Sequence, residues 1–350
     1  MEPITSYIVA AVLAVLVCVT LALSLRRGPA TRVEAAKVEA PELIRKEEKR
    51  MAKTMEEMVG LIDAIPDEPA KNGEFVLAET MSTASAHAVR DDDIVFAGTG
   101  LPMVGIMCAQ FLNAPHALLI YEAGVCDGKT MHVPASVCDH RAAYLCSSLG
   151  GLVDTFGYYL QQGFVTLGFL GGAAVDRYGG VNCTCIGDYY HPTHRFTGSG
   201  GNGDIGPMSK RCVFIILQEK RRFIERNDYT TTPGWWCYDW PSGEWKPKKE
   251  VWKGSVFAES GPEAIVSNMG VFLFDDNGEM YLDTFHPGVT VDKIKEECSF
   301  DLNVSRVRGE TPRPTYRELF VIREFVDPER IFLPEPLPEY PPDIKKLIEG

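Results

Sequence analysis

The stretch "DDDIVFAGTGLP", Asp91 to Pro102, joins a short apolar run to a glycine loop and decides the predicted fold class. An apolar run with helical spacing follows it, from Met103 to about Leu112. A strand that passes through a tight glycine turn into a helix is the repeating unit of α/β proteins. We therefore expect the body of the chain to be an α/β domain.

Three further apolar runs are predicted to be strands, and helical stretches separate them. They are "HALLIY" (His116–Tyr121), "FVTLGFLGGAAVD" (Phe164–Asp176) and "VFIIL" (Val213–Leu217). Continuous apolar runs are typical of strands that are buried on both faces, as in a parallel sheet. Later, "GVFLFDDNGEMYL" predicts a hairpin around Asp276-Asn277-Gly278, and Thr290 or Asp292 is expected to cap a helix. The prediction is an open α/β domain with a largely parallel sheet.

The chain divides into four predicted segments: an N-terminal membrane anchor (1–27), a charged linker (28–74), a globular domain (75–333) and a proline-rich tail (334–350) expected to be extended. Within the linker, apolar residues at helical spacing predict an amphipathic helix that docks on the body or on a partner. These residues are Met51, Met55, Met58, Val59, Ile62 and Ile65. A solvated stalk is the alternative.

The N-terminal run from Ser6 to Leu25 is uncharged, and about 20 apolar residues suffice to cross a bilayer. Arg26, Arg27 and Arg32 follow it, whereas no Lys or Arg precedes it. The positive-inside rule then predicts a single-pass protein, anchored in the membrane through residues 6–25, with its catalytic domain in the cytoplasm. A cleaved signal peptide or a misassigned start codon is the alternative.

Composition excludes some classes of function. The chain has 350 residues and a formal charge of −13, from 48 acidic and 35 basic residues. This balance argues against nucleic-acid binding over a broad basic face. The ten cysteines have no disulfide-type spacing, which indicates free thiols in a reducing compartment.

Glu122, in "YEAGVCDG" (Tyr121–Gly128), is the first candidate for chemistry. It follows a predicted buried strand and precedes Ala123 and Gly124, whose small size leaves room for a ligand. Partial desolvation there would make its carboxylate reactive toward a carbonyl group. An ordinary charge at the end of a strand is the alternative.

Two glycine-rich loops are candidate anion or oxyanion sites. "GTGLP" places Gly98 and Gly100 between a strand and a helix, where backbone amides favour negative charge. "GSGGNG" contains Gly198, Gly200 and Gly201 and matches the dinucleotide pattern G-x-G-x-x-G by its letters. Its polar leader and Pro207 do not fit a strand-to-helix turn, so a dinucleotide site is not expected. Consecutive glycines can still turn amides toward an oxyanion, and a flexible loop is the alternative.

The run "CTCIGDYYHPTH" brings two cysteines and two histidines close together in sequence. They are Cys183, Cys185, His191 and His194. A single residue separates the cysteines, which is closer than the usual zinc-knuckle spacing of two to four. We predict no metal site here, with buried thiols and loop histidines instead.

Several segments together resemble a known family: "FAGTGLPMVG", "YEAGVCDG", "FLGGAAVDRYGGVNCTCIGDYYHPTHRFTGSGGNGDI" and "EKRRFIERNDYTTTPGW". They are similar to the β half of class I CoA-transferases of the glutaconate and 3-oxoacid type. The likeness runs in order from about Phe75 to Leu333, so it covers nearly all of the predicted globular domain, and is strongest in "GDYYHPTHRFTGSGG" and "EKRRF".

The resemblance implies a mechanism and a partner. In that family a glutamate in an E-x-G loop becomes acylated and then carries CoA as a thioester, and the matching position is Glu122. The run with Gly198, Gly200 and Gly201 is implied to supply oxyanion-binding amides, and the loop with Gly98 and Gly100 a second wall of the site. Coenzyme A is then a substrate, and no permanently bound cofactor is expected. A separately encoded α subunit is also implied, because only the β half is present.

Two departures from the family pattern bear on function. The family loop often reads E-N-G or E-S-G, whereas Ala123 stands between Glu122 and Gly124 here. The segment from Pro241 to Glu263 looks like a local extension. Two alternatives to transfer stay open: hydrolysis of a CoA ester or a CoA-linked ring on the same scaffold, and a non-catalytic membrane adaptor for an α subunit.

Overall fold

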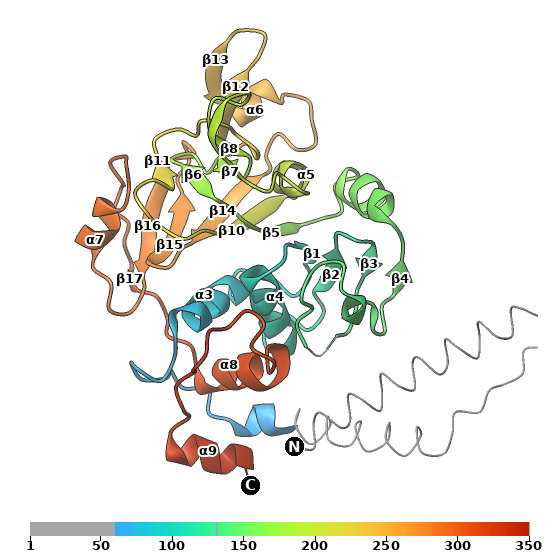
Figure 1. Ribbon diagram of the computed structural model, residues 1–350, viewed down its shortest axis with the longest axis vertical. Coiled ribbons are helices and arrows are strands. Elements are labelled where there is room, and N and C mark those ends of the chain that lie inside the picture. The colour runs from blue at the N-terminus through green and yellow to red at the C-terminus, as the bar shows by residue number, and fades with distance from the viewer. Residues whose placement is uncertain (1–59, 131, 350) are drawn as a thin grey trace, which may run out of the picture. The chain divides into compact units, whose positions relative to one another are not determined.

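The computed structural model describes residues 60–130 and 132–349. Its main feature is a ten-stranded mixed sheet, drawn in Figure 1. In spatial order its strands are β17 (Gly309–Glu310), β16 (Met280–Phe285), β15 (Gly270–Phe274), β14 (Gly261–Val266), β10 (Arg211–Ile215), β5 (Leu167–Gly171), β1 (Ile94–Ala97), β2 (Leu118–Tyr121), β3 (Val125–Cys126) and β4 (Ser148–Leu149).

The centre of this sheet is parallel. Strands β2, β1, β5, β10 and β14 pair in parallel, and antiparallel strands continue the sheet on both sides. In sequence order β1 comes first. The next strand, β2, pairs on one side of it, and β5, which comes later in the chain, pairs on the other side. The predicted α/β class with a largely parallel sheet is therefore confirmed for the body.

Smaller strand pairs lie beside the main sheet. The three-stranded sheet contains β11 (Phe223–Ile224), β6 (Ala174–Asp176) and β7 (Val181–Asn182), and the two hairpins are β8 (Cys185–Gly187) with β9 (Pro192–Arg195) and β12 (Trp236–Asp239) with β13 (Glu244–Pro247). Of this last hairpin, β13 lies within the segment from Pro241 to Glu263, whereas β12 precedes that segment.

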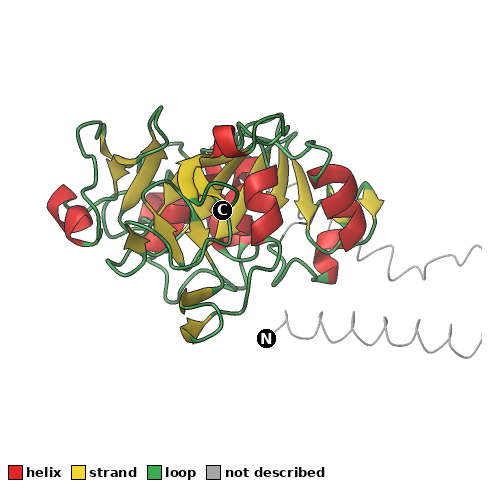
Figure 2. Ribbon diagram, turned by 90° about the horizontal axis from the view of Figure 1, so that it is seen from above, coloured by secondary structure: helices red, strands yellow, loops and turns green. Residues whose placement is uncertain are grey.

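Helices pack beside the strands, as the view from above in Figure 2 shows. The α-helices are α3 (Leu77–Ala86), α4 (Leu101–Phe111), α5 (Asn202–Met208), α6 (Lys248–Val251), α7 (Val291–Glu296), α8 (Tyr316–Phe320) and α9 (Pro342–Glu349). A 3₁₀ turn, η1 (His140–Ala143), and two π-helical segments, η2 (Asp154–Leu160) and η3 (Val321–Val326), complete the described helices.

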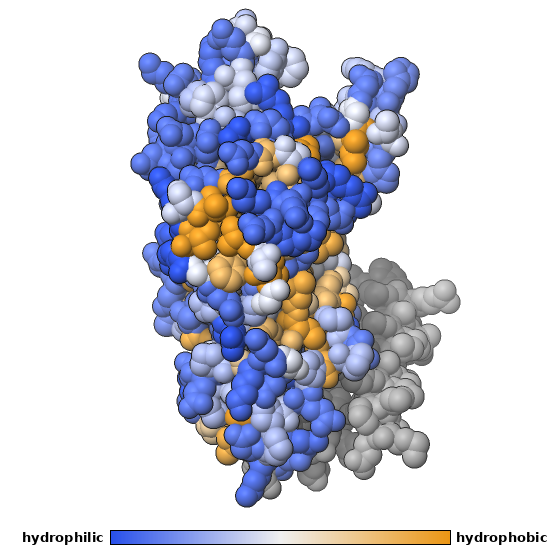
Figure 3. Space-filling view, turned by 90° about the vertical axis from the view of Figure 1, so that its left-hand side faces the viewer, coloured by the Kyte–Doolittle hydropathy of each residue, from blue (hydrophilic) through white to orange (hydrophobic). Residues whose placement is uncertain are grey.

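Alternating side chains divide the core into two layers. In β1, Val95 and Ala97 join the cluster formed with α3, α4, α8 and η3, whereas Phe96 joins the cluster that contains residues of α5 and α7. This follows from the two-residue period of a strand. Figure 3 shows hydrophobic residues across the middle of one face, at the height of the sheet, between hydrophilic ends. The two core clusters cover the sheet on both faces, as its apolar strands require.

Most predicted elements form where the sequence placed them, with three differences. The run from Phe164 to Asp176 forms two strands, β5 and β6, in different sheets. Gly172 lies between the two strands. A Cβ there would lie 2.7 Å from Val181 Cγ1 and 2.8 Å from Ile216 Cδ1, so a glycine lets the chain pass close to these side chains. The helix after the glycine loop begins at Leu101, before the predicted start at Met103. Pro102 falls in its first turn, where a proline is tolerated.

The third difference is the C-terminal tail, which is not wholly extended. Its last part forms α9, where Ile344 is buried in the core cluster of α3 and α4. In the predicted linker, residues 60–64 are helical, and Ile62, Ile65 and Ala70 are buried in that same cluster. The part of the linker from residue 60 onward therefore packs on the body, and the rest of it lies outside the described residues.

The predicted membrane-anchored localisation is corrected. Within residues 60–130 and 132–349, no helix has the length and apolar character needed to cross a membrane. The run from Ser6 to Leu25 lies outside the described residues. We withdraw the prediction of a single-pass membrane protein, and with it the membrane as a partner.

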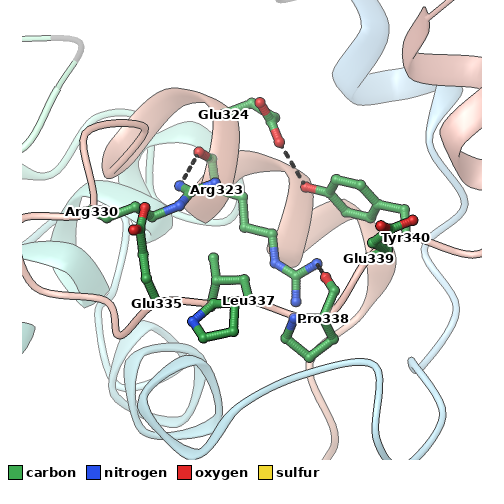
Figure 4. Close-up of a pocket in the computed structure, with 9 residues that line it drawn as sticks. Arg323, Glu324, Arg330, Glu335, Leu337, Pro338, Glu339 and Tyr340 are labelled. Atoms are coloured by element: carbon green, nitrogen blue, oxygen red, sulfur yellow. Dashed lines mark hydrogen bonds between the residues drawn. The ribbon is translucent and has the colours of Figure 1, made fainter.

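A buried ion pair fixes the C-terminal segment to α3. The Arg323 guanidinium donates to both carboxylate oxygens of Glu79, at 2.6 and 2.9 Å, and also to the carbonyl oxygens of Glu74 and Pro338. Figure 4 shows this side chain beside Leu337 and Pro338, in a pocket of about 600 Å³. Because the Arg323 guanidinium uses its N–H groups to connect distant segments of the chain, we assign this pocket a structural role.

Arg323→Ala is expected to lower the free energy of unfolding by about 3–5 kcal/mol, because Glu79 would stay buried without its partner. Urea denaturation measures this loss. The double variant Glu79→Leu/Arg323→Met should recover most of it, since no lone charge remains. Lys293→Ala, which breaks exposed pairs with Glu296 and Glu297, is the matched control and should cost about 1 kcal/mol or less.

Candidate active site

The carboxyl ends of β1, β2 and β5 meet at one edge of the sheet. Gly98 follows β1, Glu122 follows β2, and Gly172 follows β5. Because the chain adds β2 and β5 on opposite sides of β1, this edge contains a topological switch point of the parallel sheet. Ligands of open α/β sheets bind in the crevice at such a point.

Glu122 lies in a tight turn directly after β2. The Gly124 N–H donates to the Tyr121 carbonyl oxygen at 3.0 Å, which makes Glu122 and Ala123 the central residues of the turn. Gly124 has φ +114°, and a Cβ there would lie 2.2 Å from the Gly150 carbonyl oxygen. The turn therefore requires glycine at position 124, which gives a physical reason for the glycine in the E-x-G pattern.

The turn directs Glu122 away from the neighbouring tyrosine. Tyr121 is fully buried among the side chains of α3 and α4, on one face of the sheet. The half-buried Glu122 side chain lies beside Gly201, which precedes α5, and lines a pocket together with Phe156 of η2. The buried hydroxyl of Thr155, in η2, donates to the Glu122 carbonyl oxygen at 3.1 Å and fixes the backbone of the turn.

Gly201 brings the glycine run to the Glu122 carboxylate. A Cβ at Gly201 would lie 2.8 Å from Glu122 Oε1 and 2.7 Å from Phe156 Cζ, so any larger residue there would force one of these side chains to move. Asn202, at the start of α5, donates to the Gly171 carbonyl oxygen at 2.9 Å and ties the run to the end of β5. Within the described residues, the backbone N–H groups of Gly200 and Gly201 donate no hydrogen bond. Both N–H groups are therefore unpaired in the described part of the chain.

A pocket of about 370 Å³ contains the Glu122 carboxylate. Its walls combine three apolar side chains, two glycines and three polar side chains: Leu152, Phe156, Leu160, Gly200, Gly201, Glu122, Gln161 and Asp204. In the described residues, the Glu122 carboxylate has no hydrogen-bond or ion-pair partner of its own. The arrangement places an unengaged carboxylate beside unengaged amides.

The other glycines of the predicted site do not line this pocket. Gly98 follows the neighbouring strand, and its N–H already donates to the Phe169 carbonyl oxygen at 2.7 Å. A Cβ at Gly98 would lie 2.8 Å from that oxygen, so the glycine allows β1 and β5 to end close together. Gly100, with φ +103°, begins α4, and Gly198 lies in open space with φ +110°. The structure thus unites Glu122 with Gly200 and Gly201.

The structure places the cysteines and histidines that the sequence had singled out. Cys185 is buried as predicted, Cys183 is only partly buried, and His191 and His194 are exposed on the β8–β9 hairpin. In the described part of the chain, His, Cys, Asp and Glu form no group of three or more that could hold a metal ion. Cys126, near Glu122 in sequence, lies in the buried core, and burial raises the pKa of its thiol. A thiolate is therefore disfavoured at Cys126.

The sequence did not identify the residues of η2 as part of the site. Leu152, Phe156 and Leu160 come from a run in which no motif for chemistry stands out. The centroid of the Phe156 ring also lies 5.2 Å from the centroid of the Phe96 ring, in β1. Only the tertiary structure brings this segment over the Glu122 turn.

Comparison with known proteins identifies the class of this fold and site. The family model described as Coenzyme A transferase matches residues 78–297. The B subunit of glutaconate CoA-transferase from Acidaminococcus fermentans is 36% identical over 264 residues, which cover 74% of this chain and 95% of the relative. The B subunit of 3-oxoadipate CoA-transferase from Pseudomonas knackmussii is 30% identical over 246 residues, covering 70% and 91%. The chain therefore belongs to the coenzyme A transferase family.

A solved structure agrees with this assignment, and a more distant sequence relative is named for a different reaction. The crystal structure of glutaconate coenzyme A-transferase from A. fermentans superposes with a TM-score of 0.66 at 34% identity, covering 75% of this chain and 98% of the other. The cholesterol ring-cleaving hydrolase IpdB subunit of Rhodococcus jostii is a more distant relative, 27% identical over 166 residues that cover 46% of this chain and 60% of the relative. The predicted family and enzyme class, that of a CoA-transferase, are confirmed.

Gly201→Ala is expected to reduce enzymatic activity by about 100-fold or more, because its methyl group would displace the Glu122 carboxylate or Phe156. Gly203→Ala in the same helix is the matched control, since a Cβ there meets nothing closer than Thr231 O at 3.5 Å. Steady-state rates and circular dichroism distinguish misplacement from unfolding. Equal activity of the two variants would contradict the close approach.

Proposed function

We propose that this chain transfers coenzyme A between an acyl-CoA and a carboxylic acid by a ping-pong mechanism, with Glu122 as the covalent nucleophile. The observation that supports this proposal most directly is the unengaged Glu122 carboxylate beside the amides of Gly200 and Gly201. A carboxylate suits the reaction because its acyl and CoA adducts are anhydrides and thioesters. Each can react onward without a large loss of free energy.

The first half-reaction moves CoA onto the enzyme. A Glu122 oxygen attacks the thioester carbonyl carbon, the C–S bond breaks, and CoA thiolate leaves a mixed anhydride behind. The thiolate then attacks the glutamyl carbonyl carbon and expels the first carboxylate. Glu122 now holds CoA as a thioester.

The second half-reaction reverses this order with the acceptor acid. The acceptor carboxylate attacks the glutamyl thioester, and CoA thiolate leaves a new mixed anhydride. The thiolate attacks the acyl carbonyl carbon of that anhydride. The new acyl-CoA leaves, and the Glu122 carboxylate is restored.

Backbone amides stabilise the tetrahedral oxyanion of each step in this proposal. Gly200 and Gly201 are the proposed donors, with Gly198 and Gly100 as further members of the two glycine loops. Removal of one such donor costs about 3–4 kcal/mol in comparable sites. Gly98 contributes the close approach of β1 and β5, because its own N–H is already bonded to Phe169.

A separately encoded α subunit is the proposed partner, and two observations support it. The glutaconate and 3-oxoadipate relatives are each named as the B subunit of an enzyme. In this chain, large apolar side chains with high exposure are frequent from residue 144 to residue 164. They are Tyr144, Leu145, Leu149, Leu152, Val153, Tyr158 and Phe164. This segment includes β4, the strand at one end of the ten-stranded sheet (Figure 1). Leu152 also lines the Glu122 pocket, so this surface continues into the proposed site.

Hydrolysis is the second candidate function, because one relative is named a ring-cleaving hydrolase. For a CoA ester, water would attack the same covalent intermediate in place of an acceptor acid, whereas hydrolysis of a CoA-linked ring would open the ring and keep the thioester. The products distinguish the two reactions. Transfer conserves the thioester in a new acyl-CoA, whereas thioester hydrolysis releases free CoA.

Glu122→Gln should lower kcat by about 10⁴-fold or more, because the amide cannot serve as the nucleophile. In the unaltered enzyme, acyl-CoA without an acceptor should leave CoA attached at Glu122. Borohydride reduction followed by mass spectrometry of the peptide from Tyr121 to Gly128 locates this adduct.

Cys126→Ser is the matched control for that experiment, since Cys126 is the competing nucleophile in the same peptide. It should keep most of the activity, because its thiol is buried and its pKa is raised by burial. The reverse result, an inactive Cys126→Ser and an active Glu122→Gln, would exclude the proposed mechanism.

The partner surface predicts an assembly defect. Leu149→Asp/Val153→Asp should weaken binding to the coexpressed α subunit by about 30-fold or more, because charge enters an apolar interface. Val256→Asp is the control: Val256 is 82% exposed, like the altered residues, but lies in the extension. Titration by size-exclusion chromatography with light scattering measures both, and equal binding would place the interface elsewhere.

A further inference from the structure

Lys248 is a fully buried lysine with no acidic partner among the described residues. It lies at the start of α6, within the extension from Pro241 to Glu263. Its ammonium donates to the Ser260 carbonyl oxygen at 2.8 Å, to Ser260 Oγ at 2.7 Å and to the Pro207 carbonyl oxygen at 3.3 Å. Three donors thus meet three acceptors, and none of these acceptors carries a charge.

One of those acceptors belongs to the helix of the proposed site. Pro207 lies in the last turn of α5, where carbonyl groups have no partner within the helix. Lys248 and the Ser260 hydroxyl both donate to this carbonyl oxygen. A cation at the carboxyl end of a helix is favourable, so the extension caps α5 from outside.

The other end of α5 contacts the proposed nucleophile. Gly201 precedes the helix and lies against the Glu122 carboxylate. The helix and the residue that follows it pack tightly on β5: a Cβ at Gly168 would lie 3.0 Å from Ile205 Cγ2, in α5, and 2.8 Å from Ser209 Oγ, directly after it. A short, tightly packed helix therefore connects Lys248 to the Glu122 pocket.

We propose that Lys248 is a positioning residue for the Glu122 site: its ammonium clamps the carboxyl end of α5, and α5 holds Gly201 against the Glu122 carboxylate. The inference rests on the proposed function for its effect on turnover. Its effect on α5 is independent of that function.

The charge of Lys248 has a cost to stability. The groups that face its ammonium are the thiols of Cys237 in β12 and Cys212 in β10, together with the Trp252 ring at 4.6 Å. Burial lowers the pKa of Lys248 to about 8, from 10.5 in the unfolded chain. The unfolded chain therefore binds more protons between these values, so stability rises with pH in that window. Below it, the full cost of burying the charge is present.

Lys248→Met should accordingly leave the melting temperature unchanged or raise it, since an apolar side chain avoids that cost. The same variant should lower kcat by about tenfold or more, with KM changed less than about twofold, because the site is misplaced instead of lost. Kinetics on the enzyme with its coexpressed partner subunit measure both. In the unaltered enzyme kcat should fall as pH rises through about 8, and Lys248→Arg, which stays charged, should lose that fall.

Hydrogen–deuterium exchange on the full chain tests the clamp without any assay of activity. The amides of Asp204, Ile205 and Ser209, which are bonded within α5, should exchange about tenfold faster in Lys248→Met. Ser260→Ala, which removes a second contact to Pro207, should act in the same direction. Lys246→Met is the matched control, because Lys246 pairs with Asp239 and Glu244 on the same extension and does not contact α5.

The outcomes separate this inference from the proposed function. Unchanged exchange in α5 together with unchanged kcat in Lys248→Met would overturn the clamp, and so would a lower melting temperature that accounts for the loss of activity. If Glu122→Gln kept its turnover, that result would refute the role of Glu122 as nucleophile and not the role of Lys248. In that case the exchange data would still decide whether Lys248 holds α5.

Discussion

Parallel pairing of β2, β1, β5, β10 and β14 is the constraint on which the rest of the structure depends. It brings the carboxyl ends of these strands to one edge, so that turns far apart in sequence can share a pocket. Independently of that pairing, the pleat of each strand places neighbouring side chains on opposite faces. Tyr121 therefore anchors the end of β2 in the core beneath the sheet, while Glu122 is left for the pocket on the other face.

The pocket depends on close approaches that only glycine permits. Gly124 fits beneath the Gly150 carbonyl, Gly98 lies against the end of β5, and Gly201 touches the Glu122 carboxylate. Each glycine sacrifices backbone entropy on folding and gains proximity of backbone groups. The buried ammonium of Lys248 has a similar character, because it is unfavourable for stability and well placed for support of α5.

Water exclusion connects the proposed partner surface to the proposed chemistry. An anhydride or thioester at Glu122 is open to hydrolysis wherever water reaches the pocket. The exposed apolar residues from 144 to 164 begin at the wall of that pocket, with Leu152 common to both. A subunit that covers this surface would bury apolar area and close the pocket together. In this view assembly favours transfer over hydrolysis on a scaffold whose relatives include both kinds of enzyme.

The sequence alone determined the α/β class, the main strands and Glu122 as the candidate nucleophile, because these depend on local signals. Apolar runs, turn glycines and the E-x-G pattern are each contained within a few neighbouring residues. It misjudged the tail, since Pro342–Glu349 is helical only where Ile344 can pack into the core. The family resemblance had already placed Gly201 in the Glu122 site, but only the tertiary structure brought Phe156 to that site and Lys248 to the end of α5. Their contacts arise from packing between segments that are distant in the chain, and no local pattern encodes such a distance.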